Sequence, residues 1–148
     1  MKKKISLING PNLNLLGTRQ PAIYGTATLD SILHMVSERA KQREYEVAAF
    51  QSNYEGAVID AVQQAATTSN GLLINAGAYT HSSLAIRDAL EHLSIPKVEV
   101  HLSNIHRREE FRRVSVLSPV VDGVICGFGA QSYLLGLEAV INLIEQIK

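Results

Sequence analysis

Apolar residues recur along the chain in two alternating patterns. Short apolar runs, each followed by polar residues or glycine, are typical of buried strands that end in loops. Longer segments carry apolar residues at spacings of three and four, which is typical of amphipathic helices. The short runs predict strands at 5–9, 46–51, 71–74, 97–100 and 123–126. The longer segments predict helices at 28–44, 55–68, 82–93 and 132–147.

Strands that alternate with helices in this way predict a single α/β domain over residues 1–148. We expect a doubly wound parallel sheet with helices on both faces. The number of strands and the chain length favour the flavodoxin-like strand order 2-1-3-4-5. In such a sheet, ligands bind beyond the carboxyl ends of the strands, near the point where the strand order reverses. That point lies here between the first and third strands.

Composition excludes several classes of partner. The chain has 14 basic and 14 acidic residues, so it lacks the net positive charge expected of a protein that binds nucleic acid or an anionic membrane surface. Its start, three lysines and a short strand, resembles neither a signal peptide nor a spanning helix. Cys126 is the single cysteine, which fits a reducing compartment, and its apolar neighbours suggest that it fills the core. We therefore expect a soluble cytoplasmic protein.

Polar residues follow several predicted strands at the edge where ligands are expected. Asn12 follows the first strand, Asn75 the third and His101 the fourth. An irregular segment that carries Arg19 and Tyr24 leaves the same edge. A guanidinium held beside a phenol favours the ionised phenolate by charge attraction, so Tyr24 could act as a general base. In the alternative interpretation, Tyr24 only packs and Arg19 only caps a turn.

His101 is the candidate proton donor or acceptor. Glu99 lies two residues earlier, on the same face of the strand, and could orient the imidazole. The alternative is a structural histidine at a strand end. The five histidines lack metal-ligand spacing, and lysine is missing from the ligand edge, so neither a metal site nor a Schiff base is expected. The glycines of 127–132 follow the last strand and make only a weak dinucleotide fingerprint.

Four arginines, Arg107, Arg108, Arg112 and Arg113, follow the fourth strand in a charged stretch. One interpretation is a solvated helix face in which two neighbouring glutamates pair with them. The other is recognition of a carboxylate or of polarised oxygens, for which arginine is well suited.

Several motifs, in this order, span nearly the whole chain: NGPNLNLLGTRQPAIYG, QSNYEG, INAGAYTHSSLAIRDAL, EVHLSN and REEFR. In these motifs the chain closely resembles the type II 3-dehydroquinate dehydratases. The resemblance implies anti elimination of water from 3-dehydroquinate to 3-dehydroshikimate through an enolate, in the shikimate or quinate pathway. It implies no cofactor and no metal. It also implies a flavodoxin-like subunit in a homo-oligomer, a dodecamer built of trimers.

The resemblance also implies roles in proton transfer. Tyr24 would remove the proton alpha to the ketone, and Arg19 would keep Tyr24 ionised. His101 would give a proton to the departing hydroxyl. Asn12 would hold a water molecule that stabilises the enolate. The segment from Arg19 to Tyr24 would close over the substrate as a lid.

Substrate contacts are implied in the same way. Asn75, His81 and Arg112 would bind substrate hydroxyls. The backbone amides of Leu102 and Ser103 would bind the carboxylate. Asp88 would reach the site of a neighbouring subunit.

Two positions depart from the family pattern. Gln20 stands where a glutamate is more usual, and Arg107 stands where a small residue is usual. Gln20 bears on lid closure, whereas no residue with a proton-transfer role is changed.

Two other classes of protein compete with this interpretation. A non-catalytic flavodoxin-like module that binds a nucleotide or flavin would leave Arg19, Tyr24 and His101 without a joint role. A receiver-type signalling domain would need acidic residues where this chain has Asn9 and Asn75.

Overall fold

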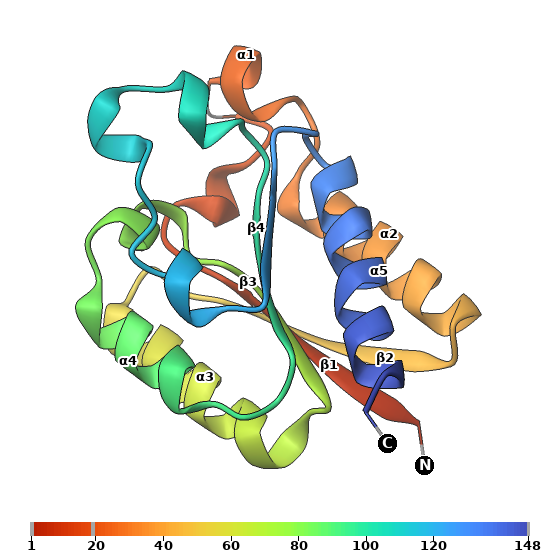
Figure 1. The fold of residues 1–148 in the computed structure, drawn as a ribbon. Coiled ribbons are helices and arrows are strands. Elements are labelled where there is room, and N and C mark those ends of the chain that lie inside the picture. Colours follow the sequence, from red (N-terminus) through yellow and green to blue (C-terminus); the bar gives the residue numbers. More distant parts are fainter. Residues whose placement is uncertain (1, 19, 148) are drawn as a thin grey trace.

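The computed structural model describes residues 2–18 and 20–147 of the chain. A five-stranded parallel sheet with the order β2-β1-β3-β4-β5 forms its centre, which confirms the predicted fold class and strand order (Figure 1). The strands are β1 Lys3–Asn9, β2 Tyr45–Gln51, β3 Gly71–Asn75, β4 Lys97–His101 and β5 Gly123–Cys126. The order reverses between β1 and β3, so the carboxyl ends of these two strands flank the switch point.

Helices cover both faces of the sheet (Figure 1). On one face α2 and α5 pack against the sheet, and on the other face α3 and α4 lie side by side. The helices are α1 Pro21–Tyr24, α2 Leu29–Gln42, α3 Glu55–Thr68, α4 Leu84–His92 and α5 Gln131–Glu145. Short 3₁₀ turns lie in the connections, at η1 Leu13–Leu15, η2 Gly77–His81, η3 Ile105–Arg107, η4 Glu110–Arg112 and η5 Ser118–Val120.

The apolar residues whose spacing predicted the helices are the residues that the helices bury. In α2, Leu29, Ile32 and Val36 face the sheet, and the Thr28 side chain accepts a hydrogen bond from the Ser31 amide at the helix start. Thr28 is therefore the N-cap of α2, since a threonine oxygen satisfies one of the amides left unpaired at a helix N-terminus. The central strand β3 is buried along its whole length, as expected for a strand covered on both faces.

The ends of β1 and β3 approach each other so closely that only glycine fits between them. A Cβ atom at Gly10 would lie 2.4 Å from the carbonyl oxygen of Ala76. The Gly10 amide donates to the carbonyl of Asn75 at 2.8 Å. This contact fixes the two chain segments that leave the switch point.

Three local predictions differ from the structure. The charged stretch at 106–113 does not form a helix face but two 3₁₀ turns, η3 and η4, separated by extended backbone at Arg108. Cys126 is half-buried rather than in the core, because β5 is an edge strand. The segment that includes Tyr24 was expected to be irregular but contains the short helix α1. A helix of four residues is too short to show a periodic pattern in the sequence. Pro21 begins α1, and Gly25, with φ of 83°, ends it.

Candidate active site

A pocket opens at the carboxyl ends of β1, β3 and β4, next to the switch point. It is walled by the segment after β1, by η2 after β3 and by η3 and η4 after β4. Most of the predicted site residues line it, namely Asn12, Tyr24, Asn75, His81, His101, Leu102, Ser103 and Arg112. Arg19 lies outside the described residues, so its predicted place beside Tyr24 stays a prediction.

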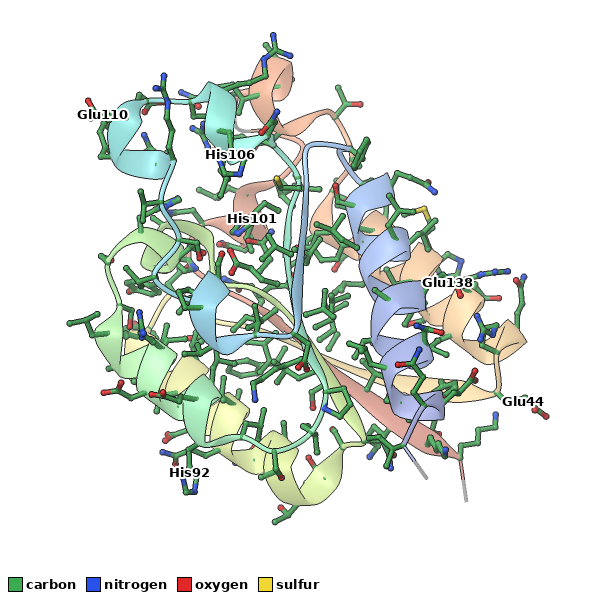
Figure 2. The ribbon with its side chains drawn as sticks, viewed as in Figure 1. Glu44, His92, His101, His106, Glu110 and Glu138 are labelled. Atoms are coloured by element: carbon green, nitrogen blue, oxygen red, sulfur yellow. The ribbon has the colours of Figure 1, made fainter. Side chains whose placement is uncertain are left out.

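His101 and Glu99 form a buried pair at the end of β4. Nε2 of His101 lies 2.5 Å from Oε2 of Glu99. The exposed fraction is 5% for His101 and 0% for Glu99, so water is nearly excluded from the contact. In Figure 2 His101 lies in the interior of the molecule, whereas His92 and Glu110 lie at its periphery. Residues two apart on a strand share a face, which is why the sequence placed these two side chains together.

Two serines that the sequence analysis did not single out donate hydrogen bonds to the other carboxylate oxygen of Glu99. The hydroxyls of Ser115 and Ser118 donate to its Oε1 at 3.0 and 3.1 Å. With His101 at Oε2, the carboxylate therefore has hydrogen-bond partners at both oxygens, as a buried carboxylate requires.

Tyr24 contacts Arg108, one of the four arginines for which the sequence left two interpretations open. The guanidinium carbon of Arg108 lies 5.1 Å from the centre of the Tyr24 ring, within the range of a cation–π contact. Arg108 is largely buried and lines the pocket, and its Nε lies 3.8 Å from Oε1 of Glu109. Among the described residues, this Nε is a buried atom without a hydrogen-bond acceptor. Arg108 thus places a positive charge against the Tyr24 ring.

A buried tyrosine connects the ends of β1 and β3. The hydroxyl of Tyr133, on α5, donates to Oδ1 of Asn9 at 2.7 Å and accepts from Nδ2 of Asn75 at 3.0 Å. Oδ1 of Asn75 also accepts from the amide of Gly77 at 3.1 Å. Burial raises the pKa of Tyr133 far above its ordinary value, and the hydrogen bond from Asn75 only partly offsets this. Tyr133 therefore stays protonated and fixes the amide of Asn75 at the pocket.

Asn12 occupies a left-handed backbone conformation, with φ of 68°, at the start of η1. Asparagine tolerates this conformation better than most residues. The Asn12 amide donates to Oδ1 of Asn53 at 3.0 Å, and Asn53 in turn accepts from Nε2 of Gln51 at 3.2 Å. The loop after β2 thereby positions the loop after β1.

His81 and Arg112 enter the pocket from neighbouring 3₁₀ turns. Nδ1 of His81 lies 2.8 Å from the carbonyl oxygen of Val114. A carbonyl only accepts, so Nδ1 carries the proton and Nε2 is left as an acceptor. Arg112 forms an ion pair with Glu109. A hydrogen bond with its own backbone lowers the pKa of Glu109 first of all, and the charges of Arg112 and Arg108 lower it further.

Asp88 does not belong to this pocket. It is exposed on α4 and borders a groove between α3 and α4, together with Gln63 and His92. The structure therefore separates Asp88 from the other predicted site residues of the same chain.

Neither a metal cluster nor a spanning helix occurs in the described part of the chain. Residues 2–18 and 20–147 contain no group of three or more histidine, cysteine, aspartate or glutamate side chains that could hold a metal ion. Within the same residues, no helix is long and apolar enough to cross a membrane.

A flavodoxin-like domain with a phenol, a buried His–Glu pair and several amides at its switch point has the architecture of an enzyme that acts on a small polar molecule. The chain belongs to the class II dehydroquinase family, whose model matches residues 3–141. The expected family is thereby confirmed.

Individual relatives support the same assignment. The 3-dehydroquinate dehydratase of Geotalea daltonii is 54% identical over 97% of this chain and 99% of its own length. The crystal structure of the type II dehydroquinase from Butyrivibrio crossotus superposes with a TM-score of 0.92 at 47% identity, covering 95% of this chain and 98% of the other. The type II dehydroquinase from Propionibacterium acnes gives the same TM-score at 41% identity, covering 96% of this chain and 98% of the other.

Proposed function

We infer that this chain is a hydro-lyase that removes water from 3-dehydroquinate and releases 3-dehydroshikimate, a step of the shikimate pathway. The match to the class II dehydroquinase family supports the reaction. The observation that carries it is that the Tyr24 phenol and the His101 imidazole line one pocket, with Glu99 directly behind His101. An elimination of this kind needs one group that takes a proton and another that gives one.

Tyr24 acts as the base in this proposal. Its phenolate takes the proton alpha to the ketone, and the electron pair of the broken C–H bond passes to the carbonyl oxygen to give an enolate. The Arg108 guanidinium over the Tyr24 ring places a positive charge beside this base. The sequence assigned this function to Arg19, and both arginines can share it.

His101 acts as the acid. As the enolate collapses, the C–O bond to the leaving hydroxyl breaks and His101 supplies the proton that makes this group water. Glu99, buried against Nε2, stabilises the positive imidazolium that precedes this transfer. The reaction is an acid–base elimination with no change of oxidation state, so we propose that it uses neither a metal nor a cofactor.

Substrate binding falls to the remaining polar residues of the pocket. We propose that Asn12 holds a water molecule near the enolate oxygen and that Asn75, His81 and Arg112 bind the hydroxyls. The backbone amides of Leu102 and Ser103, at the end of β4, bind the carboxylate. Support comes from their common place in one pocket, from the donors that amide and guanidinium groups offer, and from the acceptor nitrogen of His81.

Ultraviolet absorbance tests the proposed function. The purified protein is mixed with 3-dehydroquinate, and the absorbance of the conjugated enone acid is followed beside Tyr24→Phe. A rise for the parent protein and little or none for the variant supports both the reaction and the base. If neither folded protein responds, the pocket serves another ligand, and bound flavin or nucleotide in the preparation would indicate the binding module.

We further propose that the chain assembles into a dodecamer built of trimers, in the cytoplasm. Asp88 is exposed and lies away from the pocket of its own chain, which agrees with a place at a neighbour's site. The single cysteine fits a reducing compartment. Light scattering gives the molecular mass, and cell fractionation gives the location.

Co-expression of two inactive variants tests the shared site. Assemblies that contain both Tyr24→Phe and Asp88→Ala subunits should regain part of the activity if Asp88 serves a neighbour's pocket. If the mixture is as inactive as Tyr24→Phe alone, Asp88 acts elsewhere.

A further inference from the structure

The hydrogen bonds around Ser115 have a fixed direction. Its Oγ accepts from the backbone amides of Leu117 and Ser118, at 3.1 and 3.0 Å. A hydroxyl has two acceptor lone pairs and one proton. Because both lone pairs face amide donors, the proton is left for the third neighbour, Oε1 of Glu99, at 3.0 Å.

This direction continues through Glu99 to His101. Oε1 accepts from Ser115 and from Ser118, so it carries no proton. Hydrogen bonds to the charged form of a carboxylate favour that form. An ionised carboxylate only accepts, so at Oε2 the donor is Nε2–H of His101.

The remaining ring nitrogen of His101, Nδ1, then becomes the one that exchanges protons with a bound molecule. The charged imidazolium carries a proton on each nitrogen. After Nδ1 gives its proton away, the neutral ring keeps the Nε2–H form that Glu99 already holds. No rearrangement of the ring is needed between the two states.

We propose that Ser115 and Ser118 are positioning residues that fix the direction of the Glu99–His101 hydrogen bond, so that Nδ1 of His101 is the nitrogen that delivers the proton. Neither serine lines the pocket, so both act through Glu99. As a statement about catalysis, this proposal rests on the proposed dehydration. As a statement about the resting imidazole, it stands without substrate.

Nitrogen-15 NMR of protein labelled in its histidine rings gives the first test. The His101 signals are assigned by their loss in His101→Gln. At a pH where the ring is neutral, we expect a protonated Nε2 and an unprotonated Nδ1. In Ser118→Ala and Ser115→Ala this preference should weaken, because Glu99 loses a donor that favours its ionised form. A parent protein with the neutral ring protonated on Nδ1 would overturn the proposal.

Steady-state kinetics give the second test. Each serine-to-alanine variant should lose about tenfold in kcat, the usual worth of a hydrogen bond to a charged group. KM should stay nearly unchanged, because neither hydroxyl reaches the pocket. Ser118→Thr keeps the hydroxyl and should restore kcat, while Ser37→Ala, the same change on α2, should have no effect.

Ser118→Ala is the cleaner variant, since Ser115 also accepts two backbone amides and its loss can disturb the turn. If Ser118→Ala matches Ser37→Ala in both kcat and the His101 spectrum, the serines do not position the pair. If the parent protein converts no 3-dehydroquinate, the proposed function fails, and the spectra without substrate still decide whether the serines direct the imidazole.

Discussion

The guanidinium of Arg108 lies over the ring of Tyr24, with 5.1 Å between the guanidinium carbon and the ring centre. The two residues come from different sides of the pocket, Tyr24 from α1 after β1 and Arg108 from the end of η3 after β4. The contact therefore joins the predicted lid to the segment that follows His101. It also gives the proposed base a positive neighbour within the described part of the chain.

Replacing Arg108 should weaken the base. Arg108→Gln removes the positive charge over the Tyr24 ring, and we expect kcat to fall about tenfold or more, since a cation–π contact in a partly dry site is worth about 1–2 kcal/mol. Steady-state kinetics with 3-dehydroquinate measure the loss. The matched control is Arg107→Gln, because Arg107 is an exposed arginine next to it. Equal activity of the two variants would show that the charge of Arg108 does not assist Tyr24.

Glu99→Gln should move the proton of the neutral His101 imidazole from Nε2 to Nδ1. The glutamine carbonyl is expected to face the donors Ser115 and Ser118, which leaves its NH₂ group to donate to Nε2 of His101. The neutral ring must then carry its proton on Nδ1. We expect a loss of about a hundredfold in kcat, since general acid catalysis contributes that much or more.

Nitrogen-15 NMR and steady-state kinetics measure both effects of Glu99→Gln. Glu110→Gln, an exposed position on η4, serves as the control. An unchanged Nε2–H form in Glu99→Gln would contradict the hydrogen-bond direction deduced for this site.

Tyr133→Phe should lower stability. The change leaves Oδ1 of Asn9 without its donor and Nδ2 of Asn75 without its acceptor, inside the protein. An unpaired buried polar group costs about 1–3 kcal/mol, so we expect a loss of about that size in the free energy of unfolding. Urea unfolding at fixed protein concentration measures it. Tyr54→Phe, at a tyrosine that is 78% exposed, should leave stability unchanged.

The same tyrosine should make stability depend on alkaline pH. Burial raises the pKa of Tyr133 in the folded protein above its value in the unfolded chain. Above a pH of about 10, the unfolded chain loses this proton while the folded protein keeps it, so stability falls as pH rises. Below that pH the contribution is constant.

Unfolding free energies measured between neutral pH and about pH 11 should therefore decline at the alkaline end. The decline should be smaller in Tyr133→Phe, which has no proton to lose at this position. Equal slopes for the parent and the variant would show that Tyr133 does not resist ionisation in the fold.

Short apolar runs predicted the strands, and apolar residues at spacings of three and four predicted the long helices, because each long helix buries one face in one of two cores. The rule for parallel sheets then placed Asn12, Asn75 and His101 at one edge, where the pocket lies. The interpretation of 106–113 as a helix face, one of the two left open, was wrong because charge alone, without an apolar stripe, does not specify a helix.

Residues that support the site were harder to find. Tyr133 lies 124 positions from Asn9, and Ser115 lies 16 positions from Glu99 in an irregular connection. No local pattern marks such long-range hydrogen bonds. Arg108 stands among four similar arginines, and only the path of the backbone through η3 and η4 distinguishes it. The contact between Arg108 and Tyr24 could therefore be found only from the structure.

One connection, from η3 through η5, carries both the pocket arginines and the serines that hold Glu99. The arginines that would select a substrate and the serines that would position Glu99 and His101 thus belong to the same short stretch of chain. Changing the length of this connection, in order to fit a larger or differently charged substrate, would therefore also displace His101, the proposed proton donor. Altered selectivity should be sought first through side-chain replacements at Arg112 or His81, which leave the path of this connection intact.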